Sequence, residues 1–352
     1  INDNYLYKEH IIKSFLFLRF LILFLVVNKL VEKNLFNINL FFISCAFFAM
    51  AVSMDLIVQV ILKKNILINP LVFQPSTFFG VENIAGGYLQ KFSLFFIILI
   101  VSLVKKNKLN LYSNLLFMFF LIPILLTGNR MPLILYIFSA FIFFTLQKKI
   151  KETFLFLVFT LLIIFFSIKY FPGGRLSNTL KNFYTGSKII ITQFINLNQN
   201  DELFKNKANA TDTDARSYIL HYNTAFKILK ENKFFGSGLK SFRLKCTYET
   251  GNTCNSHPHN YILEILVDTG VLGFILIYLI FIFSIFDFFK FYRHNFGLNL
   301  QLFSIPFFLI VFLEFFPLRS SGSFFTTNNA TVIFIMVAFL ISISSLQKSK
   351  VK

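Results

Sequence analysis

The chain has 352 residues, of which 56% are hydrophobic and only 14% are charged, and its mean hydropathy is +0.68. A soluble domain carries roughly 25% charged residues and cannot bury this much apolar surface, so a soluble enzyme, a disordered chain and a disulfide scaffold are excluded. The formal net charge is +18. Many cations stand in short clusters between apolar runs, which indicates membrane loops and no nucleic acid partner. The sequence therefore predicts an all-α polytopic membrane protein in a lipid bilayer.

About nine apolar runs are long enough for membrane-spanning helices, which need ~20 residues each. In chain order they are residues 11–27, 38–62, 84–104, 111–128, 131–147, 153–170, 260–286, 301–318 and 329–346. The third run is the weakest, because Gly86, Gly87 and Lys91 interrupt it. The first run carries Lys13 and Arg19, so we expect it to pack against protein.

Clusters of cations alternate between the two sides of the predicted membrane. The richer set is Lys29 and Lys33, then Lys105, Lys106 and Lys108, then Lys148, Lys149 and Lys151, then Lys290 and Arg293, and finally Lys348, Lys350 and Lys352. The positive-inside rule places these loops and the C-terminus in the cytoplasm, although the pair Lys63 and Lys64 departs from it. The predicted domains are then an N-terminal bundle of six spans (1–170), one long external loop (171–258) and a C-terminal bundle of three spans (259–352).

The long external loop is expected to cap a membrane cavity. It opens with the helix breakers Pro172, Gly173 and Gly174. A helix is predicted over residues 213–231 from the apolar residues that recur at helical spacing, namely Ala215, Ile219, Tyr222, Phe226 and Leu229.

The three cysteines fall in two settings. Cys246 and Cys254 bracket a polar stretch of the external loop, where a disulfide bond and two free thiols fit the sequence equally well. Cys45 lies inside a predicted span and is expected to serve packing. No cysteine or histidine spacing fits a metal site, so no metal and no cofactor are predicted.

Ionisable residues gather at the external ends of the spans and in the external loop. They are Asp55, Glu82, Arg130, Arg216, Arg243, His257, His259, Glu314 and Arg319. Charged groups are costly at membrane depth, which makes them functional candidates. A cavity lined with arginines and a few carboxylates suits an anionic, lipid-linked substrate, whereas Glu314 and Arg319 could equally form a structural ion pair.

The sharpest local pattern is Ser256-His257-Pro258-His259-Asn260. It predicts a helix start, with Ser256 or His257 as the cap and Pro258 at the first helical position. His259 then stands in the first helical turn, where the positive end of the helix dipole favours a neutral imidazole that can act as a general base. The alternative is a histidine that merely caps the helix or binds its backbone.

Two glycines follow His259 along the predicted helix. In a continuous helix His259, Leu266, Gly270 and Gly273 share one face, so the glycines would let another helix approach beneath the histidine. Glu264 and Asp268 lie well round from that face and are poor candidates to orient His259.

These residues resemble the signature of the O-antigen ligase and O-antigen polymerase superfamily. His259-Asn260 followed by nine residues and Gly270-x-x-Gly273 is similar to its histidine motif. Other segments resemble its remaining motifs: Thr127-Gly128-Asn129-Arg130; Arg216 ahead of Lys233-Phe234-Phe235-Gly236-Ser237-Gly238-Leu239; and Asp55, Gln59 and residues 79–89. The family usually shows more than nine spans, and the chain begins with Ile, which together agree with missing N-terminal spans.

The resemblance implies a GT-C-like, metal-independent, inverting glycosyltransferase of the bacterial inner membrane, with the long loop in the periplasm. The donor would be an oligosaccharide on undecaprenyl diphosphate, and the acceptor a sugar hydroxyl on lipid A-core or on another lipid-linked repeat. Arg130 and Arg216 would bind the diphosphate, because a guanidinium binds phosphate oxygens bidentately and stays charged. His259 would be the base or orient the acceptor, beside Asn260.

The remaining residues have weaker roles in this reading. Arg243 and Arg319 are second-rank substrate ligands, and Glu82 and Asp55 bind acceptor hydroxyls or serve packing. A lipid-linked oligosaccharide flippase or other polysaccharide transporter and a protein O-oligosaccharyltransferase stay as alternatives. A transporter should show inverted repeats or charges through the bilayer depth, whereas these polar groups gather on one side.

Overall fold

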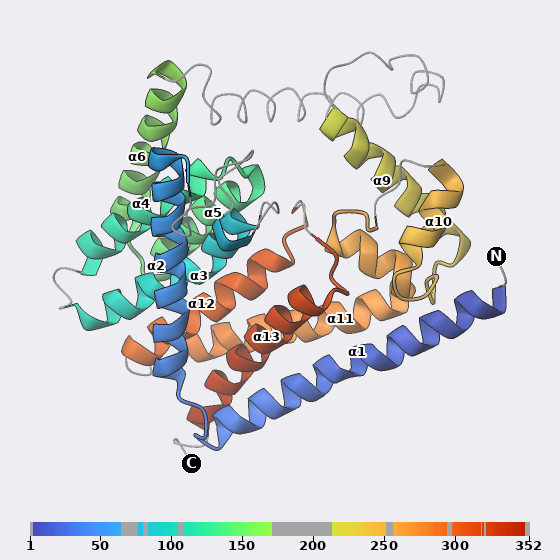
Figure 1. Cartoon of the computed structure of the whole chain (residues 1–352). Coiled ribbons are helices and arrows are strands. Elements are labelled where there is room, and N and C mark those ends of the chain that lie inside the picture. Colours follow the sequence, from blue (N-terminus) through green and yellow to red (C-terminus); the bar gives the residue numbers. More distant parts are fainter. Residues whose placement is uncertain are drawn as a thin grey trace. The chain divides into compact units, whose positions relative to one another are not determined.

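The computed structural model describes residues 3–64, 77–79, 84–104, 109–170, 213–250, 256–293, 298–317, 319 and 322–348. Figure 1 shows the helices that these residues form. In chain order they are α1 (Asp3–Glu32), α2 (Ile38–Leu62), the short 3₁₀ helix η1 (Thr77–Phe79), α3 (Ala85–Leu103), α4 (Leu109–Leu126), α5 (Arg130–Leu146), α6 (Ile150–Tyr170), α9 (Thr213–Glu231), α10 (Ser241–Thr250), α11 (Tyr261–Arg293), α12 (Leu298–Glu314) and α13 (Thr327–Lys348).

Each of the nine predicted apolar runs is a helix. In the described part of the chain, five helices are long and apolar enough to cross a membrane: Ile11–Glu32, Ile38–Leu62, Ala85–Leu103, Tyr261–Arg293 and Thr327–Ser344. Three further apolar helices are shorter: Leu111–Leu126, Arg130–Leu146 and Gln301–Glu314. The prediction of an all-α membrane protein is therefore confirmed, whereas nine spans and a GT-C-like arrangement stay predictions.

The chain forms two compact units, and each unit combines segments that are separated along the sequence. Unit 1 contains α1, α9, α10, α11, the last residues of α12, and α13. Unit 2 contains α2 to α6, η1 and most of α12. The sequence groups the first span with the N-terminal bundle, whereas α1 packs along α13. Its tertiary contacts therefore place α1 in unit 1.

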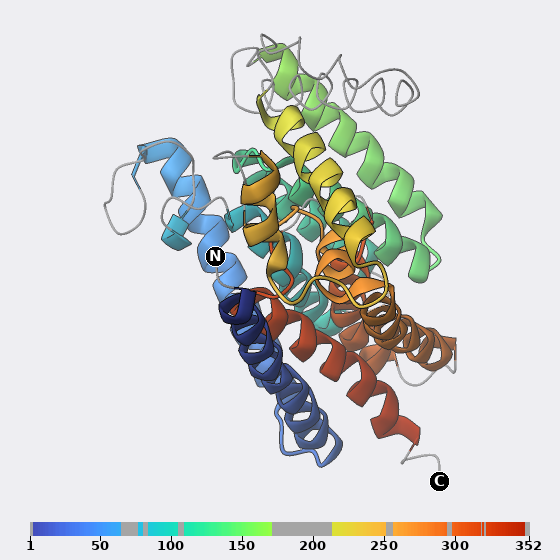
Figure 2. The same cartoon turned by 90° about the vertical axis from the view of Figure 1, so that its right-hand side faces the viewer.

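Aromatic side chains hold α1 against α13, and the two helices lie side by side in Figures 1 and 2. Phe17 packs edge-on against Phe334 and Phe325, with ring centroids 5.8 Å and 5.1 Å away. The Arg19 guanidinium donates a hydrogen bond to the Thr327 hydroxyl, 2.7 Å away. The Arg19 side chain is thus satisfied by protein, as its position in a predicted span requires.

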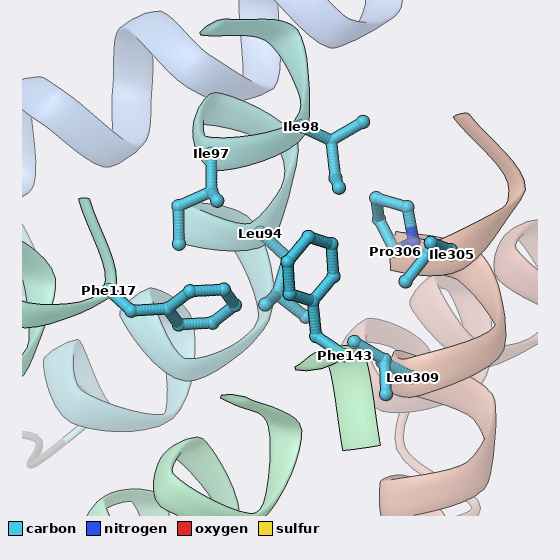
Figure 3. Close-up of a pocket in the computed structure, with 8 residues that line it drawn as sticks. All are labelled: Leu94, Ile97, Ile98, Phe117, Phe143, Ile305, Pro306 and Leu309. Carbon is cyan, nitrogen blue, oxygen red and sulfur yellow. The ribbon is translucent and has the colours of Figure 1, made fainter. Parts of the chain in front are cut away.

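Unit 2 is held together by phenylalanines from α2, α3 and α12. Phe42 is fully buried and packs edge-on against Phe95 and Phe303, with centroid distances of 5.0 Å and 4.6 Å. Figure 3 shows an apolar pocket inside this unit, and it leaves no room for a water molecule. The lining residues are Leu94, Ile97, Ile98, Phe117, Phe143, Ile305, Pro306 and Leu309. This pocket is a packing defect between helices and has no polar group for a substrate.

The predicted helix over 213–231 is confirmed as α9. Its inner face joins α10 and the start of α11 in one apolar cluster. The buried members are Ala225, Ile228, Phe242, Cys246, Leu263 and Val267. Tyr222 and Leu229 pack against this cluster as predicted, but Phe226 is 48% exposed, because the inner face is centred on Ala225 and Ile228. The side chains of residues 213–220 lie outside the described part of the structure.

Candidate functional site

The start of α11 differs from the predicted one. The helix begins at Tyr261, and the Asn260 side chain caps it by accepting a hydrogen bond from the Leu263 backbone amide at 3.1 Å. Ser256, His257 and Pro258 all precede the helix, so the predicted cap and first position are wrong.

Asn260 caps α11 because its side-chain amide makes hydrogen bonds both as acceptor and as donor. While its oxygen caps α11, its Nδ2 atom donates to the Pro317 carbonyl at 2.8 Å. The segment after α12 is thereby tied to the start of α11. Asparagine is among the best caps, and this second bond fixes its place.

His259 precedes the cap and is not in the first turn of α11. Its φ of 55° lies in the left-handed region, which a helix interior excludes and which non-glycine residues rarely adopt. The predicted helical face shared by His259 and the later glycines therefore does not exist. The left-handed conformation turns the half-buried imidazole toward α9 instead of along α11.

Three histidine rings meet at this turn. The His257 and His259 ring centroids are 4.3 Å apart, and the His221 ring of α9 lies 5.6 Å from that of His259. His257 Nδ1 is also 3.0 Å from the Ser256 hydroxyl. His257 and His259 are half-buried, whereas His221 is only 1% exposed. The imidazole of His259 is thus held between two others with part of its surface open.

His221 was missed by the sequence analysis. Burial, and next the neighbouring His259, lower the pKa of His221 below its ordinary value, so its ring stays neutral at neutral pH. The signal that could have found it is its place on the inner face of the predicted loop helix, one turn before Ala225, where a polar residue is unusual.

Gly270 interrupts α11. Its φ of 67° and ψ of −173° are not helical and fall in a region that is essentially restricted to glycine. The segment 233–238 fills the interruption: the amides of Ser237 and Gly238 donate to the carbonyls of Val267 and Asp268, at 2.8 Å and 2.9 Å. In return, the Val271 amide donates to the Lys233 carbonyl at 2.8 Å. The backbone groups that the break releases are therefore satisfied by the loop.

Gly270 of the histidine motif allows this break, and the predicted approach of another helix at Gly270 is wrong. A Cβ atom on Gly270 would stand 2.3 Å from the Phe234 carbonyl oxygen, and one on Gly236 would stand 2.4 Å from the Gly270 amide nitrogen. A Cβ atom on Gly273 would meet the Thr269 side chain of its own helix at 2.4 Å. Loop and helix approach so closely only because both are glycine at the contact.

Glu264 and Asp268 connect α11 to its neighbours. The Glu264 carboxylate accepts hydrogen bonds from the Ser323 hydroxyl at 2.5 Å and the Phe324 amide at 2.6 Å. The Asp268 carboxylate accepts from the Lys240 amide at 2.6 Å and the Ser241 hydroxyl at 3.0 Å. Asp268 thereby satisfies the amino end of α10, whose first donors need an acceptor. These hydrogen bonds hold α11 against neighbouring segments, which agrees with the expectation that neither residue orients His259.

Glu314 and Arg319 form a buried ion pair, with Arg319 Nη1 2.8 Å from Glu314 Oε1 and side chains 1% and 11% exposed. Burial alone would lower the pKa of Arg319, but Glu314 and Tyr261 together outweigh burial and raise that pKa. The Arg319 guanidinium also lies over the Tyr261 ring, 5.8 Å from its centroid. Of the two predicted readings the structural pair is the one observed, and Arg243 is exposed on α10.

Unit 2 brings two of the predicted motif segments together. A Cβ atom on Gly86 of α3 would stand 2.7 Å from the Thr127 hydroxyl and 3.0 Å from Asn129 Nδ2. Gly128 makes this turn with a φ of 71°, and half-buried Arg130 then begins α5. The glycine of α3 therefore allows the turn that presents Arg130 to pack closely.

Asp55 and Gln59 lie one turn apart on α2 and are both buried in unit 2. Gln59 Oε1 accepts a hydrogen bond from the Thr77 amide at 3.3 Å, so this polar face supports η1. This contact favours the packing alternative for that face. Glu82 lies outside the described residues.

Two other predicted site residues are only partly described. Arg216 is in α9, and its side chain lies outside the described part. Cys246 is buried and disulfide-bonded, whereas Cys254 lies outside the described residues, so the pairing of these two stays a prediction. Cys45 is free and buried, as expected of a packing residue.

Residues 115–278 match the family model described as O-Antigen ligase. The match confirms the resemblance to the O-antigen ligase and polymerase superfamily, and it includes Arg130, Arg216, His259 and both glycines of the histidine motif. A search of curated proteins found no match to the chain. The family indicates a membrane protein with a glycosyltransferase-like activity. Among the described residues, no group of three or more His, Cys, Asp or Glu side chains could hold a metal ion.

Proposed function

We propose that the protein is an O-antigen ligase or polymerase that transfers a saccharide from undecaprenyl diphosphate to a sugar hydroxyl on the periplasmic face of the bacterial inner membrane. The observation that carries the proposal is the half-open imidazole of His259, held in a left-handed turn between two other histidines inside the matched family region. An imidazole that packs against other rings and stays partly exposed can accept a hydroxyl proton when it is unprotonated.

In the proposed reaction, the acceptor hydroxyl oxygen attacks the anomeric carbon while His259 takes the hydroxyl proton. The bond from that carbon to the diphosphate oxygen breaks, and undecaprenyl diphosphate leaves with the bonding electron pair. A single displacement of this kind inverts the anomeric configuration. His221 stays neutral beside His259, so it does not repel the imidazolium that forms.

The leaving diphosphate needs positive charge more than it needs an acid. Arg130 suits this role, because it combines a guanidinium with the amino end of α5, where backbone amides and the helix dipole also favour an anion. Arg216, at the amino end of α9, is proposed for the same diphosphate. Arg319 is better suited to positioning, because its charge is already compensated by Glu314.

A lipopolysaccharide gel of a deletion strain, complemented with variants, tests the proposal. Arg130→Ala and Arg216→Ala should each abolish polysaccharide assembly while the protein still inserts into the membrane, and Arg293→Ala, an exposed arginine at the far end of α11, should not. Loss of the ladder to a single repeat on core identifies a polymerase. Loss of all O-antigen on core, with lipid-linked polymer accumulating, identifies a ligase. An unchanged ladder in the deletion strain, or wild-type activity of both site variants, contradicts the proposal.

A further inference from the structure

Two neighbouring phenylalanines project from the loop that fills the break in α11. Phe234 is 68% exposed and Phe235 is 80% exposed. Burial of a large apolar side chain is favourable, so leaving two adjacent phenylalanine rings in water is costly. Their backbone cannot withdraw them, because the carbonyl of Phe234 accepts a hydrogen bond from the Leu272 amide at 3.2 Å.

The part of α11 that follows the break is long enough by itself to cross a membrane. The helix from residue 271 to residue 293 would be about 34 Å long at ~1.5 Å per residue, which matches a hydrocarbon core of ~30 Å. Lys290 and Arg293 stand at its far end. If this part of α11 crosses the bilayer, Gly270 and the loop bound to it lie where the helix leaves it.

The exposed apolar face of α11 begins directly beside the loop. Leu272 and Leu276 are 46% and 65% exposed, and such side chains in a membrane-crossing helix face lipid. The hydrogen bond between Phe234 and Leu272 joins the two surfaces, so the apolar face of the helix continues onto the loop. Lys233, which is exposed next to the two rings, can lay its apolar stem along them and place its ammonium among lipid headgroups.

We propose that the loop around Phe234 and Phe235 is a membrane anchor, with both rings inserted among the acyl chains of the phospholipid leaflet at that end of α11. The external segment that carries α9 and His221 would then be held to the bilayer by side chains as well as by its backbone bonds to α11. The surface fits lipid because it combines exposed aromatic rings, an adjoining lysine and continuity with a lipid-facing helix. This inference does not depend on the proposed glycosyl transfer.

The chain contains no tryptophan, so a single introduced tryptophan reports on its own site. Phe234→Trp and Phe235→Trp are placed in the full-length protein, reconstituted into phosphatidylcholine vesicles with and without brominated acyl chains. Leu276→Trp, on the lipid-facing part of α11, is the positive control. Phe242→Trp, at a side chain only 1% exposed in the core beneath α9, is the buried control.

Brominated lipid should quench the tryptophans at 234 and 235 by at least half the fraction lost at 276, while aqueous iodide quenches them little. The vesicles contain no lipid-linked saccharide, so this quenching can come only from the bilayer. Strong iodide quenching without bromine quenching would show that the rings stand in water and would overturn the proposal. Protection from both quenchers, as at 242, would indicate that protein covers the loop and would overturn it equally.

Discussion

Two neighbouring polar regions of unit 1 use ionisable side chains in opposite ways. Along α11, Glu264 and Asp268 are each 2% exposed, and each accepts two hydrogen bonds from a neighbouring segment. Just before α11, the His257 and His259 side chains are half-buried, and their ring centroids lie 4.3 Å apart. The first region holds the elements in place, and the second is the region that we propose for chemistry.

The difference follows from the cost of burial. A buried carboxylate needs donors, so Glu264 and Asp268 are stable only where backbone amides and hydroxyls reach them. A neutral imidazole is less costly to bury, so His221 can lie inside unit 1 and support a half-open ring. Residue type alone therefore does not distinguish structural residues from reactive ones. The distinction comes from how deeply each side chain is buried and from the hydrogen bonds that it makes.

The sharpest test of this comparison replaces His259. His259→Ala should lower polysaccharide assembly by about 10²- to 10⁴-fold, the range of general base catalysis, while the thermal stability of the purified protein stays near wild type. Lys245→Ala, which removes only an exposed ion pair with Glu231, should change neither quantity. If His259→Ala instead unfolds the protein, His259 has a structural role like that of Glu264 and Asp268.

The buried ion pair should behave as an anchor. Arg319→Ala should destabilise the protein by about 3–5 kcal/mol, because it leaves the Glu314 carboxylate buried without its cation. The double variant Glu314→Ala, Arg319→Ala should recover part of that stability, measured by thermal unfolding in detergent. Arg319→Ala with wild-type stability and no activity would assign the guanidinium to substrate binding instead.

The loop contact at the break of α11 should be nearly as sensitive. Gly270→Ala should destabilise the protein by about 2–4 kcal/mol, because a Cβ atom there would collide with the Phe234 backbone and the φ is positive. Gly87→Ala is the matched control, since a Cβ atom on that helical glycine has no neighbour within 4 Å. Equal expression and melting temperature for the two variants would contradict the described break.

The smallest expected effect is a pH dependence of stability. Folding lowers the pKa of His221 below its ordinary 6.5, through burial first and His259 second. As the pH falls through 6.5, the unfolded chain binds a proton that the folded protein refuses, so the free energy of unfolding falls until the lower folded pKa is reached. The loss is about 1.4 kcal/mol for each unit by which the pKa is lowered. His221→Gln should remove this part of the acid destabilisation in melting curves recorded across that range, and an unchanged pH dependence would contradict it.

The helices and the motif positions were accessible from sequence because they depend on local patterns. Apolar runs predicted nine helices, and periodicity predicted α9 with the bounds that the structure shows, Thr213–Glu231. The start of α11 was not accessible in the same way. Ser256, His257 and Asn260 are all acceptable near a helix start, and the choice depended on the Pro317 carbonyl, 57 residues away along the chain.

By itself, the sequence determined that the chain is an all-α membrane protein, because composition and hydropathy carry that information. Its resemblance to the O-antigen ligase and polymerase superfamily made Arg130, Arg216 and His259 the candidate site residues. Only the tertiary structure decided that His221 stands beside His259, that Gly270 breaks α11, and that the loop 233–238 fills the break. Each of these depends on partners distant in sequence, whose hydrogen bonds and close contacts form only when the chain has folded.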